Sequence, residues 1–223
     1  MILAFDTSGP RGSVAVAHEG DVLARGMLVH QTGHASGLIP MIEDVLEDAG
    51  VDRGELTGLL VGEGPGSFTG VRVAAATAKG LSRALRITLW PVSSLAAAAL
   101  AVEEGAVRYA LFDARAERVY GACYGVGGAR VETLVEPHAG ELRDVLDSDV
   151  PPGAVFVGDA SEKHRAVIEG AGFPVLAGDA EISLADGFIR YWVARPDGFG
   201  PVEDSGAWEP EYVRASSAER LWG

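Results

Sequence analysis

Short apolar runs alternate with longer amphipathic stretches along the first half of the chain. The runs predict strands at residues 2–5, 13–17, 21–29, 59–62 and 88–91. Between them, apolar residues recur at three- and four-residue spacing, which predicts helices at residues 36–49, 69–85 and 93–104. Pro40 is expected in the first turn of the first helix, where its missing amide is tolerated, and Gly50 suits the end of that helix.

The same pattern begins again in the second half. Residues 109–113 repeat 3–6, residues 119–124 repeat 13–17, and residues 154–159 repeat 58–63. The offset of about 100 residues is too long for a solenoid and predicts two related α/β lobes with the actin-like, ribonuclease-H-like element order. We predict lobes at residues 1–104 and 105–223 and a boundary near residues 105–108. A last helix at residues 187–195 is expected to pack back on the first lobe, and residues 196–205 are expected to be loop.

Charge narrows the class of partner. The chain has 32 acidic and 18 basic residues, a formal net charge of −14 at pH 7. Nucleic-acid-binding proteins usually present a basic surface, because neutralising phosphate supplies much of their affinity. We therefore expect that any nucleic acid in this protein's biology is held mainly by a partner.

Two further features bear on the cellular compartment. The single cysteine, Cys123, excludes an internal disulfide framework. No apolar run is long enough for a membrane span, and the N-terminus lacks the layout of a signal peptide. We expect a cytoplasmic protein that does not enter membranes.

A glycine-rich segment, residues 62–72, follows a predicted strand and opens the second helix. Its glycines permit positive φ and a close backbone approach. They are Gly62, Gly64, Gly66 and Gly70. Ser67 and Thr69 can cap the helix, whose free amides favour an anion. The Gly-Lys-Ser/Thr ending of a Walker A motif is absent. Two interpretations stay open, a phosphate or anion site and a tight turn that binds nothing.

The two long helices of the first half each suggest a surface. The second helix is slim because it is rich in alanine, and four basic residues fall within about 60° on one side of it. These are Arg72, Lys79, Arg83 and Arg86. They form either a solvated face or a docking edge for an acidic partner or a phosphate. The first helix has a wide apolar face, including Leu38, Met41 and Val45, for which the default is burial in the chain's own core. Its width favours an additional helix–helix interface.

No catalytic constellation is evident. Asp6 and Asp113 each end a first strand, and two carboxylates facing a cleft between the lobes could hold magnesium, yet neither is followed by a clear phosphate loop. His30 and His34 have helical metal-ligand spacing but fall in an expected loop. Three serines lack a recognisable base partner. These are Ser8, Ser67 and Ser94.

Residues 64–72, Gly-Pro-Gly-Ser-Phe-Thr-Gly-Val-Arg, are nearly diagnostic of the TsaB (YeaZ) family, which the chain resembles almost from end to end. Further matches lie at residues 2–8, 34–40, 92–95, 112–120 and 209–214, and the likeness is weaker between residues 130 and 204.

The resemblance implies a two-lobed actin-like fold and a non-catalytic subunit. Its expected partners are TsaD, which transfers a threonylcarbamoyl group to tRNA adenosine beside the anticodon, and the ATPase TsaE. Pairing with TsaD is expected through the first-lobe helices, with homodimers through the same surface when the chain is alone and only indirect contact with tRNA. The paired metal-ligand histidines of TsaD are missing, so its activities are not carried over. The alternatives are an actin-like ATPase or glycoprotease-like metallopeptidase acting by itself, and an anion-binding module.

These arguments select two sets of residues. The predicted partner interface contains His34, Leu38, Met41, Ile42, Val45, Arg72, Ala75, Lys79 and Arg83. The predicted contacts for a nucleotide or anion are Asp6, Thr7, Ser8, Gly66, Ser67, Phe68, Thr69 and Gly70. No metal and no tightly bound cofactor is expected. If ATP or ADP binds, we expect it at the interface with TsaD. We expect Leu38→Glu or Ala75→Glu to block pairing without unfolding the lobe.

Overall fold

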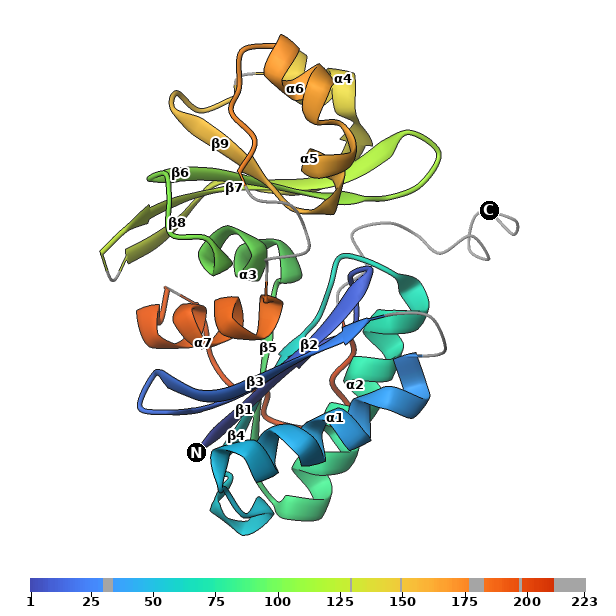
Figure 1. Cartoon of the computed structure of the whole chain (residues 1–223), viewed down its shortest axis with the longest axis vertical. Helices are drawn as coiled ribbons and strands as arrows, with labels where there is room; N and C mark the ends of the chain where they lie inside the picture. The colour runs from blue at the N-terminus through green and yellow to red at the C-terminus, as the bar shows by residue number, and fades with distance from the viewer. Residues whose placement is uncertain (30–33, 129, 149, 177–182, 197, 211–223) are drawn as a thin grey trace.

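Two α/β lobes are stacked along the long axis of the molecule (Figure 1). The computed structural model describes residues 1–29, 34–128, 130–148, 150–176, 183–196 and 198–210. In each lobe, antiparallel strands form one side of a sheet, and parallel strands joined through helices form the other. This is the two-lobed actin-like fold that the sequence predicts.

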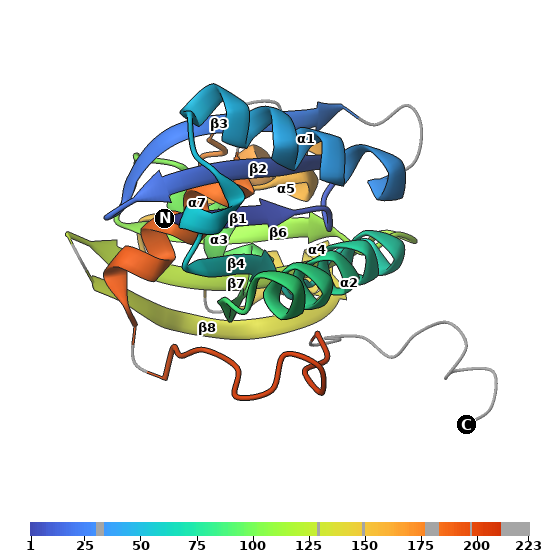
Figure 2. The same cartoon turned by 90° about the horizontal axis from the view of Figure 1, so that it is seen from below.

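The first lobe has a five-stranded sheet in the order β3-β2-β1-β4-β5. The strands are β1 (Ile2–Asp6), β2 (Arg11–His18), β3 (Asp21–Val29), β4 (Gly58–Gly62) and β5 (Thr88–Val92). One face is covered by α1 (His34–Ala49) and α2 (Phe68–Leu85), as Figures 1 and 2 show, and the short helix η1 (Arg53–Glu55) leads into β4.

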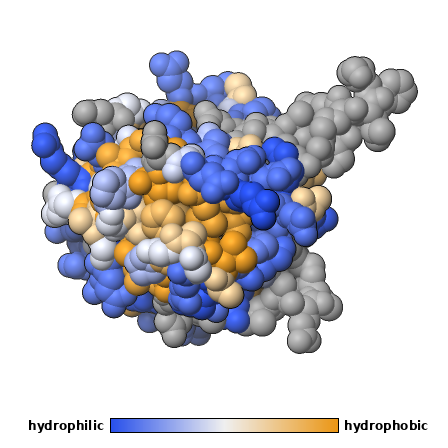
Figure 3. Space-filling view, turned by 90° about the horizontal axis from the view of Figure 1, so that it is seen from above, coloured by the Kyte–Doolittle hydropathy of each residue, from blue (hydrophilic) through white to orange (hydrophobic). Residues whose placement is uncertain are grey.

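The second lobe repeats this plan with shorter helices. Its sheet has the order β8-β7-β6-β9, and α4, α5 and α6 lie on its outer side (Figure 1). The strands are β6 (Val107–Asp113), β7 (Arg118–Gly127), β8 (Arg130–Glu141) and β9 (Ala154–Val157). The helices are α4 (Leu142–Asp147), α5 (Asp159–Lys163) and α6 (Arg165–Gly170). From above, this lobe shows an apolar area ringed by hydrophilic side chains (Figure 3).

Two helices separate the sheets. The helices α3 (Ser94–Ala101) and α7 (Leu184–Ala194) lie between the lobes and pack on each other (Figure 1). The buried alanines of α3 permit this close packing. The amide of Ala185 donates to the Ser13 hydroxyl at 3.0 Å, and Arg25 pairs with Asp186 at 2.6 Å, so the start of α7 is tied to the first lobe.

Most predicted elements are present, with shifted ends. The first helix begins at His34, which puts Pro40 in the second turn rather than the first, so that expectation was wrong. Gly50 does follow the helix in the left-handed region, with φ +64°. The third helix ends at Ala101, three residues early. The proposed division into residue ranges of two domains stays a prediction. No helix in the part of the chain described is long and apolar enough to cross a membrane.

Candidate functional site

The glycine-rich turn lies directly on the residues that follow β1. The amide of Ser67 donates to the Ser8 carbonyl at 2.7 Å, and the Thr7 hydroxyl donates to the Gly70 carbonyl at 2.7 Å. A Cβ on Gly66 would lie 2.6 Å from the Ser8 carbonyl oxygen. A Cβ on Gly70 would overlap the Thr7 carbonyl oxygen. These two glycines are therefore required by close backbone contact within the chain itself.

This packing bears on the two interpretations of the turn. Ser67 caps α2 as predicted, because its hydroxyl accepts from the Gly70 amide at 3.4 Å. Phe68 and Thr69 are exposed, and the ring centroid of Phe68 lies 3.7 Å from the Arg72 guanidinium carbon. The space against the glycines is filled by Thr7 and Ser8, which favours the tight-turn interpretation. Nucleotide or anion contact here stays a prediction.

Asp6 is sealed beneath this turn. Its carboxylate accepts from the Ser8 amide at 2.6 Å, the Ser8 hydroxyl at 2.7 Å and the Ser94 hydroxyl at 2.8 Å. Burial raises the pKa of Asp6, although these three hydrogen bonds act in the opposite direction. The idea that Asp6 faces an open cleft was wrong, because the side chain is completely buried. Ser94 is a partner that sequence reasoning missed, since nothing in the spacing links residues 88 positions apart.

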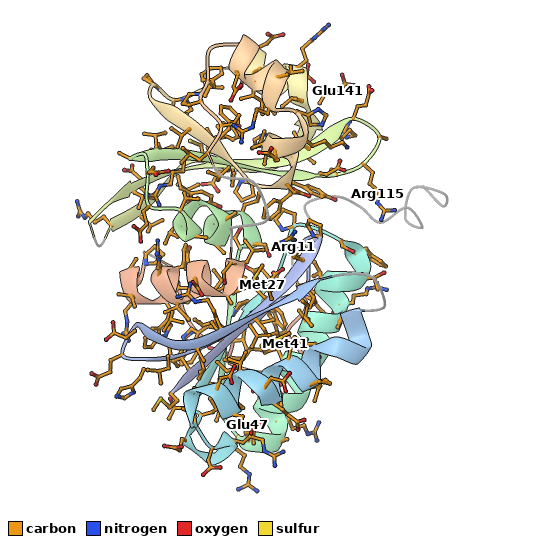
Figure 4. The ribbon with its side chains drawn as sticks, viewed as in Figure 1. Arg11, Met27, Met41, Glu47, Arg115 and Glu141 are labelled. Atoms are coloured by element: carbon orange, nitrogen blue, oxygen red, sulfur yellow. The ribbon has the colours of Figure 1, made fainter. Side chains whose placement is uncertain are left out.

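Asp113, at the matching position of the second lobe, has different surroundings. Its carboxylate pairs with Lys163 at 2.9 Å and accepts from the Arg115 amide at 3.0 Å. Burial alone would raise the pKa of Asp113, but Lys163 and the Arg115 amide outweigh it, and the pKa is lowered. Arg11 and Arg115 lie on the same side of the molecule, where the lobes face each other (Figure 4). Among the residues described, no three His, Cys, Asp or Glu side chains cluster as metal ligands would.

The exposed side of α2 is the most distinctive surface of the first lobe. Ala76 and Arg83 are exposed, whereas Ala75 is buried. Lys79 pairs with Glu209 at 2.7 Å, so the chain's own late segment lies along this helix. A groove of about 260 Å³ lies between α2 and this late segment. It is lined by Arg72, Ala75, Ala76, Lys79, Glu209 and Pro210. Sequence reasoning placed the basic stripe on one face but gave no signal for the Glu209 contact.

The apolar face of α1 requires a correction. Leu38, Ile42 and Val45 are buried against the first sheet. They are therefore core residues, and we no longer place them on a partner surface. Met41 lies between α1 and the sheet (Figure 4), over Gly26, which has no side chain to obstruct it. The side chain of His34, and all of His30, lie outside the described residues.

The fold places the chain in the class of two-lobed actin-like α/β proteins, and its first strand ends in a fully buried aspartate. A family model described as TsaD, tRNA N6-adenosine threonylcarbamoyltransferase, matches residues 29–184, more than half of the chain. The chain is 29% identical to the tRNA threonylcarbamoyladenosine biosynthesis protein TsaB of Bacillus subtilis, over 99% of this chain and 97% of that one.

Two further relatives agree with that match. The Haemophilus influenzae protein of the same name is 37% identical over 53% of this chain, and the match spans about half of its length, 51%. The structure of YeaZ from Pseudomonas aeruginosa superposes with a TM-score of 0.76 at 28% identity, over 95% of this chain and 98% of that one. The chain belongs to the TsaB/YeaZ family.

Proposed function

We propose that this chain is a non-catalytic subunit in the formation of threonylcarbamoyladenosine on tRNA, and that it works by pairing with TsaD and TsaE. The observation that carries the proposal is the match along nearly the whole length of the Bacillus subtilis TsaB protein. The net charge of −14 agrees with a subunit whose partners make most of the contacts with tRNA. We place the protein in the cytoplasm.

The geometry at Asp6 supports a subunit without its own chemistry. A catalytic carboxylate must reach a substrate, a metal or a reacting proton. Asp6 instead has both oxygens occupied by serine donors and is closed off by the glycine turn. This argues against the alternative of an actin-like ATPase or metallopeptidase that acts alone.

Reconstitution of the modification tests the function. TsaD, TsaE, tRNA and the substrates are combined with and without this chain, and modified adenosine is measured. We expect modification to depend on the chain. Equal modification without it would remove the proposal. Metal-dependent ATP turnover or proteolysis by the purified chain, lost in Asp6→Ala, would establish the alternative. Calorimetry with ATP or ADP, with and without TsaD, tests the proposed nucleotide contact.

The pairing surface is proposed to be the exposed side of α2. The slim, alanine-rich helix lets another helix approach closely, and Arg72 and Arg83 suit an acidic partner. We expect Ala76→Glu and Arg83→Glu to weaken co-purification with TsaD by at least about tenfold, because each adds a negative charge that an acidic partner surface repels. Arg143→Glu, a charge reversal at another exposed arginine, on α4 of the second lobe, is the matched control. Equal losses in all three variants, or none in the first two, would contradict this placement.

A further inference from the structure

A cavity lies on the side of the molecule opposite Arg11 and Arg115, and it has no role in the proposed pairing. It has a volume of about 650 Å³, within the range of about 300–1,000 Å³ that is typical of small-molecule sites. Four parts of the chain enclose it, namely the β2–β3 turn, the connection from α3 to β6, the adjoining ends of β7 and β8, and the last turn of α7. These elements converge on the same side in Figure 1.

Most of the cavity wall is apolar. The aliphatic side chains come from α3, the connection after it, β7, β8 and α7. They include Leu100, Val102, Val126, Val131, Val193 and Ala194. Val193 keeps 51% of its surface exposed although it lines the cavity, so this wall is an apolar surface open to a ligand. Covering such surface contributes about 25 cal/mol for each Å² removed from water.

One end of the cavity is cationic. Arg108 is buried and donates to four main-chain carbonyls, those of Ala99, Glu103, Glu104 and Gly105. No carboxylate among the described residues forms a hydrogen bond or ion pair with it.

Arg190 is the second cation at this end. It donates to the Leu100 carbonyl at 3.0 Å and to the Glu103 carboxylate at 3.1 Å, and Glu103 is the only acid among the described lining residues. Burial lowers the pKa of Arg108 most, the charge of Arg190 lowers it further, and the charge of Glu103 acts in the opposite direction. In a chain of net charge −14, this local excess of positive charge marks a place for an anion.

We infer that this cavity binds a small amphiphilic carboxylate, with its apolar body against the valines and its carboxylate at Arg190. The guanidinium offers donors beyond those it uses within the chain, and an anionic acceptor adds charge-assisted hydrogen bonds. The positive field of Arg108 favours an anion over a cation at the same position. A ligand here would touch both lobes and the connection between them, because the cavity wall is drawn from all three.

Decanoate and decylammonium, an anion and a cation with equal chains, are the probes. Each is titrated into the full-length chain below its micelle concentration, and affinity is measured by calorimetry and by the rise in Tm that a native-state ligand produces. We expect one decanoate per chain and at least about tenfold weaker binding of decylammonium. Equal affinities, or many decanoates per chain, would overturn the inference by showing only unspecific adsorption.

Three variants locate the site. Arg190→Gln removes the charge, and Val193→Glu places a carboxylate at the apolar wall. Each is expected to weaken decanoate binding at least about tenfold. Val167→Glu on α6 is the matched control, since Val167 is also a helical valine and is 56% exposed, outside the cavity. Unchanged binding in Arg190→Gln would overturn the inference even if Val193→Glu failed to fold.

The carboxylate could be free or borne by a membrane, and a vesicle experiment separates the two. Vesicles of phosphatidylserine, whose headgroup bears a carboxylate, are added to the chain, and sedimentation is measured. Our inference is a free ligand, so the chain should stay in the supernatant and decanoate affinity should not change. Sedimentation that Arg190→Gln abolishes would overturn the free-ligand inference in favour of a lipid surface.

Discussion

The two lobes place an aspartate at the same point of the same fold and surround it in opposite ways. Asp6 ends β1, is fully buried and is held by Ser8 and Ser94, and burial raises its pKa. Asp113 ends β6, is partly exposed and is paired with Lys163, and its pKa is lowered despite some burial. The duplicated backbone thus fixes where a carboxylate stands, while its neighbours decide whether the charged form is favoured.

The covering helices differ in the same manner. The first lobe has helices of 16 and 18 residues on its outer face, whereas those of the second lobe have five or six. A long helix can bury one side in its own lobe and still present an extended second side, which a helix of one or two turns cannot. This is why the proposed partner surface lies on α2 and not on its counterparts in the second lobe.

The largest expected effect comes from the glycine turn that closes over Asp6. In Gly70→Ala, the new Cβ would overlap the carbonyl oxygen of Thr7, and backbone on both sides leaves little room to move. We expect the free energy of unfolding to fall by about 3 kcal/mol or more, measured by urea denaturation.

Gly80→Ala in the same helix is the control. A Cβ at Gly80 meets nothing within 4 Å, so alanine should stabilise α2 by about 0.5–1 kcal/mol. If both variants shifted stability in the same direction, the close approach of the turn to Thr7 would not be what requires glycine at position 70.

A smaller effect is expected from removing the buried charge with Asp6→Asn. Because the folded state raises the pKa of Asp6 above its ordinary 3.8, protonated Asp6 favours folding, and that contribution is lost as pH rises through the folded value. In this window the parent's stability should fall by up to about 1.4 kcal/mol per pH unit relative to the variant. Urea denaturation of both proteins from pH 4 to pH 8 measures the difference. A gap that did not change with pH would contradict the raised pKa.

Sequence reasoning predicted the two strands and the aspartate at the end of each, but not the side chains that surround those aspartates. The apolar runs at residues 2–5 and 109–113 predicted both strands and the aspartate that ends each, because strand burial is local information. Ser94 and Lys163, which give the two aspartates opposite environments, are brought in by tertiary packing and leave no trace in sequence spacing. The prediction that Leu38 lies in a partner interface was wrong for a related reason. The width of an apolar stripe does not reveal whether the chain itself or a partner covers it.

The smallest effect is expected at Asp113. Asp113→Asn removes the charge but keeps an oxygen that can accept from the Arg115 amide, so the variant isolates the ion pair with Lys163. Both side chains are partly exposed, and a loss of only about 0.5–1 kcal/mol is expected at pH 7 and low salt.

The pH dependence should be opposite to that of Asp6. Because the folded state lowers the pKa of Asp113, its contribution is present above the ordinary 3.8 and is lost as pH falls through the folded value. A double-mutant cycle with Lys163→Gln, followed by urea denaturation from pH 2 to pH 7, measures the coupling. It should vanish at the acid end and shrink in 1 M salt, where charges are screened beyond about 3 Å. A coupling that grew as the pH fell would show that the two aspartates do not differ in the direction proposed.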